Sequence, residues 1–300
     1  MKKALGAVLL SLCLISCDRT PSPRPVAGEV PREIPRGVPQ ETGEEELPDL
    51  AEAIAMLTEK DGDSEIPAGG TGSSARVLAR AALPPEMTLK LEAAIAESPA
   101  FILELLTCLE GDPFLRRLVD KTHSLPEAYE PEDLVELKPG SYEVGRSGLR
   151  LRREAAEALE TMAAAARSDG VILVASSAYR SYEYQVQVYN RIVGEMGREA
   201  ADRESARPGY SQHQTGLTLD FGSIDDSFAQ TRAGRWILEN AGRFGWSLSF
   251  PNGYEEVTGY RWESWHYRYV GRDLAAFIDN WFGGIQQYAL QFIHAWEEEE

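Results

Sequence analysis

The stretch SQHQTGLTLDFG, residues 211–222, carries both a strand pattern and two side chains that can bind a metal ion. Its second half alternates apolar and polar residues, the apolar ones being Leu217, Leu219 and Phe221. This period of two is typical of a β-strand. Asp220 lies inside the predicted strand, and His213 precedes it. Because a strand holds its side chains at fixed angles, Asp220 is well placed to act as a metal ligand.

A second short stretch, ESWH at residues 263–266, adds Glu263 and His266. Two imidazoles and one carboxylate can hold a metal ion with one coordination position left open, and a second carboxylate can move protons beside it. Taken singly, a histidine is more often a surface or hydrogen-bonded core residue, and an aspartate can simply cap a turn. The four side chains together favour metal-assisted hydrolysis.

Other catalytic architectures fit this sequence less well. The helical zinc motif HExxH does not occur, and neither does the serine-nucleophile motif G-x-S-x-G. A di-iron bundle would need a second Glu-x-x-His pair. The remaining histidines, His123 and His294, instead have Asp120 and Gln291 three residues earlier. We expect both histidines to have a structural role or to lie on the surface.

Helix and strand signals alternate around the two stretches. Helices are predicted over 153–167, 182–195 and 236–243, and strands over 171–175, 217–221 and 246–250. Aromatic residues alternate with polar ones from 262 to 269, which predicts a further strand. The order of these elements predicts an α+β domain with a small sheet and flanking helices.

The composition limits the class of partner. The chain has 300 residues, 43% of them hydrophobic, which is enough for a substantial core in one or two domains. Its formal net charge of -18 argues against a nucleic-acid partner, because phosphate binding needs clustered Lys and Arg. Part of the negative charge lies in acidic runs at 44–46 and 297–300, which are typical of solvated segments.

The first residues predict export. Two lysines precede an apolar run over 4–15, which is too short to span a bilayer and is typical of a secretory signal. The residues that follow, Leu14-Ile15-Ser16-Cys17, resemble a bacterial lipobox, in which the cysteine is diacylated. We therefore expect a protein of the bacterial cell envelope, on the periplasmic or outer face, with a membrane anchor through lipid on Cys17. Cys108 would then be the only free thiol, an inert core residue without a disulfide partner.

Five segments are expected along the chain. They are a signal peptide over 1–17, a disordered tether over 18–82, a helical hairpin over 83–112, a catalytic domain over 113–284, and a C-terminal helix with an acidic tail over 285–300. The tether is rich in Pro, Gly and Glu, a composition that buries too little apolar surface to offset the entropy of ordering. We find no chemistry in the hairpin.

Three longer stretches resemble the signatures of a known enzyme family. SAYRSYEYQ (177–185), SARPGYSQHQTGLTLD (205–220) and TGYRWESWHYRYVG (258–271) are similar to those of the VanY-type D-alanyl-D-alanine carboxypeptidases, which are zinc D,D- and L,D-carboxypeptidases of peptidoglycan. The resemblance begins with a lead-in at Leu118 and ends at Asp273. It implies a Hedgehog- or D,D-peptidase-like fold, with a small, mainly antiparallel sheet and flanking helices.

The resemblance also implies roles for individual residues. It makes His213, Asp220 and His266 the ligands of one zinc ion per chain, and it makes Glu263 the general base. Arg180 would stabilise the developing oxyanion or hold a substrate oxygen, or else form a structural salt bridge. The implied peptide contacts are Gln185 and Ser211, which can equally be local hydrogen-bonding residues.

The implied reaction is removal of the C-terminal D-alanine from peptidoglycan stem peptides, with D,D- or L,D-specificity left open. A zinc endopeptidase acting on cross-links and a non-catalytic wall-binding lipoprotein remain as alternatives. Several residues depart from the family pattern around the pocket: Gln212 replaces a common Glu, Ser249 and Tyr254 replace an Arg and a Lys, and Ser264 replaces a Pro. All four positions for the metal and the base are intact, so these departures concern the rim of the pocket.

Overall fold

The computed structural model describes residues 71–299. The expected signal peptide, Cys17 and most of the expected tether lie outside these residues. The helices are α2 (Thr71–Ala81), α3 (Pro85–Glu97), α4 (Pro99–Glu110), α5 (Arg153–Ser168), α6 (Tyr182–Met196), α7 (Arg198–Glu204), α8 (Arg232–Asn240), α9 (Glu255–Thr258), α10 (Arg272–Phe282) and α11 (Gln286–Glu297). Three 3-10 helices join them, η1 (Gln212–Thr215), η2 (Asp226–Gln230) and η3 (Ala241–Phe244).

The strands form two small sheets. They are β1 (Leu134–Glu136), β2 (Glu143–Val144), β3 (Arg150–Arg152), β4 (Val174–Ser177), β5 (Thr218–Phe221), β6 (Trp246–Leu248) and β7 (His266–Tyr269). The larger sheet has the order β2-β4-β5-β7-β6, and β1 pairs with β3 in the smaller one. Every pairing is antiparallel except β2 with β4. The predicted fold class, α+β with a small, mainly antiparallel sheet, is confirmed.

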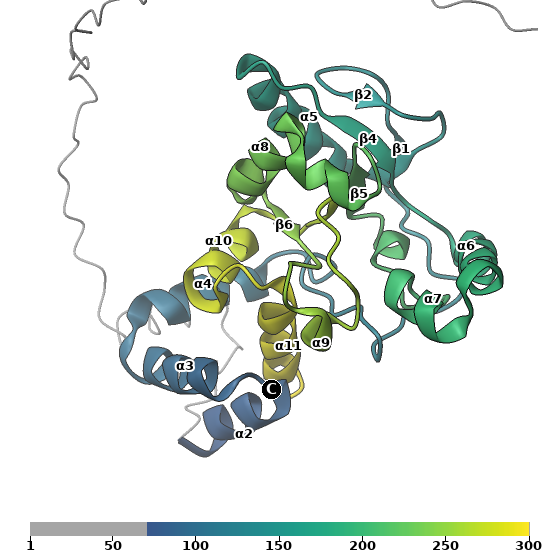
Figure 1. Ribbon diagram of the computed structural model, residues 1–300. Coiled ribbons are helices and arrows are strands. Elements are labelled where there is room, and N and C mark those ends of the chain that lie inside the picture. The colour runs from purple at the N-terminus through teal and green to yellow at the C-terminus, as the bar shows by residue number, and fades with distance from the viewer. Residues whose placement is uncertain (1–70, 300) are drawn as a thin grey trace, which may run out of the picture. The chain divides into compact units, whose positions relative to one another are not determined.

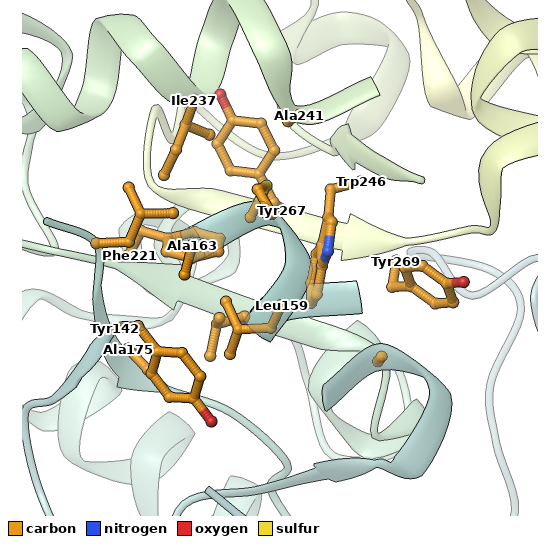
Figure 2. Packing of buried hydrophobic residues seen from close by; sticks show 14 of the residues in the cluster. Tyr142, Leu159, Ala163, Ala175, Phe221, Ile237, Ala241, Trp246, Tyr267 and Tyr269 are labelled. Atoms are coloured by element: carbon orange, nitrogen blue, oxygen red, sulfur yellow. The ribbon is translucent and has the colours of Figure 1, made fainter. Parts of the chain in front are cut away.

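The main core lies between the larger sheet and helices α5 and α8. The Ala-rich sequence of α5 turns Leu159, Met162 and Ala163 inward, and all three are fully buried. Small alanines let this helix approach the sheet closely, where Trp246 and Phe221 fill the space with their rings 6.0 Å apart. Figure 2 shows these aromatic side chains beside Leu159 and Ala163. The packed core fixes the strands that carry the candidate site.

A second core joins the two ends of the described chain. Helices α2, α3 and α4 pack with α10 and α11, as Figure 1 shows. Ser98 caps the N-terminus of α4 by accepting a hydrogen bond from the Phe101 backbone amide. The Phe101 ring is fully buried, 5.4 Å from Phe277 and 5.8 Å from Phe292. Burial raises the pKa of the Cys108 thiol in this core to about 12, which keeps it protonated.

The arrangement of the helices differs from the expected segments at two points. Residues 71–81, which the expected tether included, form α2 and pack against α11. The apolar residues Val77 and Leu78 are buried there. Burial of their surface stabilises the helix, and sequence composition alone does not reveal it. The hairpin and the C-terminal helix, expected as separate segments, share one core.

Several strand and helix ends also differ from the sequence patterns. The strand predicted over 171–175 is β4, which begins only at Val174, where pairing with β2 starts. Helix α8 begins at Arg232, before the predicted residue 236, because the Thr231 side chain caps it. The strand predicted from residue 262 begins at His266, so Glu263 lies in the loop before it.

No helix within residues 71–299 is long and apolar enough to cross a membrane.

Candidate active site

The structure brings His213, Asp220 and His266 together. One ligand atom from each of these buried side chains lies within 4.8 Å of the others. The register of the sheet brings two of the three together, since Asp220 on β5 pairs directly with His266 on β7. The third ligand candidate, His213, comes from η1, immediately before β5.

Local hydrogen bonds orient the His213 ring. Its Nδ1 lies 2.7 Å from the carbonyl oxygen of Ala178. A carbonyl only accepts hydrogen bonds, so Nδ1 carries the proton and Nε2 keeps a free lone pair. The turn that holds this ring needs Gly216, which has φ +71°. A Cβ there would lie 2.9 Å from a Leu134 methyl carbon, so the glycine serves close packing as well as backbone conformation.

His266 is held between acceptors on both sides. Its Nδ1 lies 3.1 Å from Asp220 Oδ1 and 3.3 Å from Glu263 Oε2. On the other side, Nε2 lies 3.3 Å from Gln212 Oε1. If Nε2 donates to Gln212, the Nδ1 lone pair is directed at the carboxylates, where a cation would sit.

The electrostatics of the metal-free chain separate the two histidines. Burial, reinforced by the Arg180 charge, lowers the pKa of His213 to about 4. Burial also acts to lower the pKa of His266, but hydrogen bonds to Asp220 and Glu263 outweigh it and raise the pKa to about 9. The same two histidines overcome the burial of Asp220 and hold the pKa of its carboxyl well below the usual range. At neutral pH the metal-free chain therefore has a positively charged His266, protonated on both ring nitrogens, and a neutral His213.

These residues fit a zinc ion. Two imidazole nitrogens and a carboxylate oxygen are ligands that zinc prefers, and three protein ligands leave a position open. Within the described residues, His213 Nε2 is fully buried and has no hydrogen-bond partner. An unsatisfied buried nitrogen is costly in a folded protein, and a bound cation would satisfy it. The second ring nitrogen of each histidine is engaged by an acceptor, as zinc sites require.

Glu263 lies beside this group but outside it. Its backbone amide donates to the Phe250 carbonyl, which fixes the loop before β7. The residue is 9% exposed and contributes to the walls of both cavities at the site. A carboxylate so placed can exchange protons with a group held between the cation and the cavity.

Arg180 and Gln185 form a linked pair. The Arg180 guanidinium donates to Asp220 Oδ2 at 3.3 Å and to Gln185 Oε1 at 3.1 Å. Gln185 is fully buried, and its amide nitrogen donates to the Ala206 carbonyl. The structure therefore gives Gln185 no access to a substrate, and the residue orients Arg180 instead. Arg180 itself borders both cavities, so it combines the structural ion pair with exposure to a ligand.

Ser211 is also mainly structural. Its Oγ accepts a hydrogen bond from the His213 backbone amide at 3.3 Å, which caps η1. The residue is 3% exposed. It forms part of the wall of the smaller cavity.

A buried amide network behind His266 has members that the sequence does not single out. Gln212 Oε1 accepts from Ser249 Oγ at 2.7 Å, and Gln212 Nε2 donates to Gln286 Oε1 at 3.4 Å. Gln286 lies at the start of α11 and donates in turn to the Ser247 carbonyl. Gln212 and Ser249 were noted only as departures from the family pattern, and Gln286 gave no sequence signal because it lies outside every motif.

Two cavities meet at the metal group, that is, at His213, Asp220 and His266. One is an open cleft of about 370 Å³, bounded by α6 and by the loop around Arg261. The other is a chamber of about 50 Å³ bordered by His213, His266, Tyr210 and Tyr260. Arg180, Glu204, Ser205 and Glu263 border both. A bond placed at their junction would have the metal group and Glu263 beside it.

The fold and the donor set define a zinc-dependent hydrolase. The family model for D-alanyl-D-alanine carboxypeptidase (VanY) matches residues 148–272. The chain belongs to this family of zinc carboxypeptidases, as its sequence motifs implied.

Named relatives agree with this assignment. A Bacillus subtilis (strain 168) protein named Putative carboxypeptidase YodJ is 39% identical over 182 residues, which cover 58% of this chain and 67% of that protein. A D-alanyl-D-alanine carboxypeptidase of Enterococcus faecalis is 32% identical, with 54% of this chain and 60% of that protein covered.

Solved structures show the same fold. The LdcB LD-carboxypeptidase superposes with a TM-score of 0.51 at 36% identity, covering 56% of this chain and 85% of the other. A mutant of the vancomycin resistance D,D-pentapeptidase VanY, in complex with Zn(II), gives a TM-score of 0.51 at 31% identity. The match covers 59% of this chain and 99% of the other. The zinc content of the VanY complex and the donor set of this chain confirm the predicted cofactor.

Proposed function

We propose that this protein removes the C-terminal D-alanine from peptidoglycan stem peptides. The observation that carries the proposal is the position of His213, Asp220, His266 and Glu263 at the junction of a small chamber and an open cleft. A stem peptide would lie in the cleft, with its terminal residue in the chamber. The scissile bond would then lie at the metal group.

The residues divide the chemistry among them. We assign His213, Asp220 and His266 as the zinc ligands. Zinc, when bound, lowers the pKa of a water molecule to about 7 and polarises the carbonyl group of the scissile bond. Glu263 takes a proton from the attacking water and delivers it to the leaving amine of D-alanine. Arg180, held by Asp220 and Gln185, supplies positive charge where negative charge develops on the carbonyl oxygen.

The size of the chamber supports a carboxypeptidase over an endopeptidase. A space of about 50 Å³ suits one small residue, whereas an endopeptidase needs an open groove on both sides of the bond. An endopeptidase would release peptide fragments from cross-linked dimers. We expect this protein to leave such dimers uncut at internal bonds.

The test uses purified protein with pentapeptide and tetrapeptide muropeptides, with and without a chelator, followed by mass spectrometry. We expect loss of one D-alanine from at least one substrate, abolished by the chelator and restored by zinc. Release from the pentapeptide alone would give D,D-specificity, and release from the tetrapeptide alone L,D-specificity. No release from either substrate would contradict the proposal and favour a non-catalytic role in wall binding.

We also propose that the protein is exported and anchored to the membrane by lipid on Cys17. The proposal rests on the apolar run over 4–15 and on the lipobox-like residues that end at Cys17. A Cys17→Ala variant should move from the membrane fraction to the soluble fraction of the envelope. Unchanged membrane association in that variant would contradict the lipid anchor.

A further inference from the structure

The open cleft has an exposed apolar wall. Helix α6 contributes Tyr184, Val188, Ile192 and Met196, whose spacing of four places them along one face of the helix. Tyr184 is 39% exposed and Met196 is 47% exposed, and Ile224 across the cleft is 52% exposed. Six large apolar side chains are this exposed among residues 71–299, and three of them line this cleft. Apolar surface concentrated in one hollow is typical of a ligand site.

Two arginines without acidic partners lie in the same wall. Arg191 is exposed on α6, seven residues after Tyr184 and on the same face, and it forms no ion pair or hydrogen bond within the described chain. Arg146 reaches the Tyr184 hydroxyl at 3.5 Å and lies 5.9 Å from the centre of that ring, again with no carboxylate within the part of the chain that is described.

The acidic residues of the cleft are already engaged. Glu204 accepts from Arg261 at 2.6 Å, Asp220 pairs with Arg180, and Glu263 lies 3.3 Å from His266 Nδ1. The charge left uncompensated in the cleft is therefore positive, although the whole chain has a net charge of -18. An anionic ligand would meet attraction in this cleft and repulsion over much of the remaining surface.

We propose that Arg146 and Arg191 select stem peptides whose residues before the scissile bond carry free carboxylates, and reject peptides in which those groups are amidated. This inference rests on the proposed function, because the terminal D-alanine in the chamber directs the rest of the peptide into the cleft. A guanidinium binds a carboxylate with two parallel, charge-assisted hydrogen bonds. A carboxamide offers one acceptor and no charge. The exposed wall of α6 would cover the apolar parts of the same residues.

The experiment compares two synthetic stem peptides that are identical except that the side carboxylates of the second and third residues are free in one and amidated in the other. Release of D-alanine gives kcat and KM for each. We expect the free acid to be preferred in kcat/KM by about tenfold, mainly through KM, since a hydrogen bond to a charged group contributes on that order. Raising the salt concentration should narrow the preference.

Arg191→Gln and Arg146→Gln should each reduce kcat/KM for the free acid by about three- to tenfold and leave the amidated peptide unchanged. Arg198→Gln is the matched control, because Arg198 is also an exposed arginine, at the start of α7, and does not line the cleft. Its kinetics should equal those of the wild type with both peptides.

Equal cleavage of the two peptides by the wild type, or an equal loss for both peptides in the arginine variants, would overturn the inference. Both peptides are also titrated into the zinc-loaded protein by calorimetry. Failure to release D-alanine from either peptide would overturn the proposed function, while the binding preference would still decide the role of the arginines. Tighter binding of the free acid, lost in Arg191→Gln, would uphold that role.

Discussion

The two histidines of the metal group differ in which ring nitrogen each leaves free for a cation. His213 uses Nδ1 on the Ala178 carbonyl and keeps Nε2 for a cation. His266 does the reverse, since its Nε2 faces Gln212 and its Nδ1 faces Asp220 and Glu263. The two rings stand nearly perpendicular, at 89°, and one ring nitrogen of each lies within 4.8 Å of the other. Each orientation depends on a single acceptor outside the metal group.

Glu263→Gln tests proton transfer separately from metal binding. The amide keeps the size of the side chain but cannot take a proton, so turnover should fall by about 10² or more. Zinc content should remain at one per chain, because Glu263 is not among the assigned ligands. Release of D-alanine and elemental analysis provide the two measurements. Glu256→Gln is the control, since Glu256 is an exposed acid on α9 that lines neither cavity. Full activity in Glu263→Gln would rule out the assigned base.

At the scale of the element, α11 links the helical core to the site. Its first two residues, Gln286 and Gln287, are buried amides with different partners. Gln286 joins the network that ends at His266, whereas Gln287 donates to Asp120 Oδ2 at 2.8 Å. Asp120 in turn holds the His123 ring, with Nδ1 at 2.9 Å. The second half of α11 packs against α2 and α4, so the helix is shared between the site and the helical core.

Gln286→Leu and Gln287→Leu form a matched pair. Each removes one buried amide and leaves its partners unsatisfied, so each should lower the free energy of unfolding by about 1–3 kcal/mol. Only Gln286→Leu should also weaken zinc binding, by up to about tenfold, because residues behind metal ligands tune affinity by 10- to 100-fold and Gln286 acts through Gln212. Competition with a chromogenic chelator measures the affinity. Equal zinc affinities in the two variants would refute this link.

Across the whole molecule, zinc binding and folding stability are coupled through protons. In the metal-free chain the pKa of His266 is raised to about 9, above its ordinary value near 6.5. The contribution of His266 to the free energy of unfolding is therefore complete below about pH 6.5 and is lost as the pH rises through 9. The pKa of His213 is lowered to about 4, so its contribution is present above about pH 6.5 and is lost as the pH falls through 4.

Zinc must displace the proton from His266 Nδ1, because that atom is a ligand in the assigned site. Zinc affinity should therefore increase with pH up to about 9, by as much as tenfold per unit, and the rise in Tm caused by saturating zinc should grow over the same range. Thermal unfolding between pH 6 and 9, with zinc and with chelator, measures this. His294→Gln should keep the dependence, since His294 lies on α11 outside the metal group. A rise in Tm that does not change with pH would contradict the prediction.

The sequence by itself determined the class of fold and the family, and it singled out four side chains, His213, Asp220, Glu263 and His266, that the structure brings together. These features are written in local patterns: the alternation around Asp220, the spacing of Glu263 and His266, and the turn at Gly216. It also indicated several helix positions, α5 and α6 among them, where Asp169 ends the first helix and Gly197 the second.

Only the tertiary structure decided which residues border the cavities and which are buried behind them. Gln185 had matched a substrate position, but its burial and its bond to Arg180 give it a supporting role. Gln286 lies 74 residues after Gln212, and Arg146 lies 38 residues before Tyr184. Such contacts depend on how helices and loops from distant segments pack, which is governed by burial of surface over the whole molecule and not by local sequence pattern. The same packing holds α2 against α11 and places Arg146 and Arg191 along the cleft.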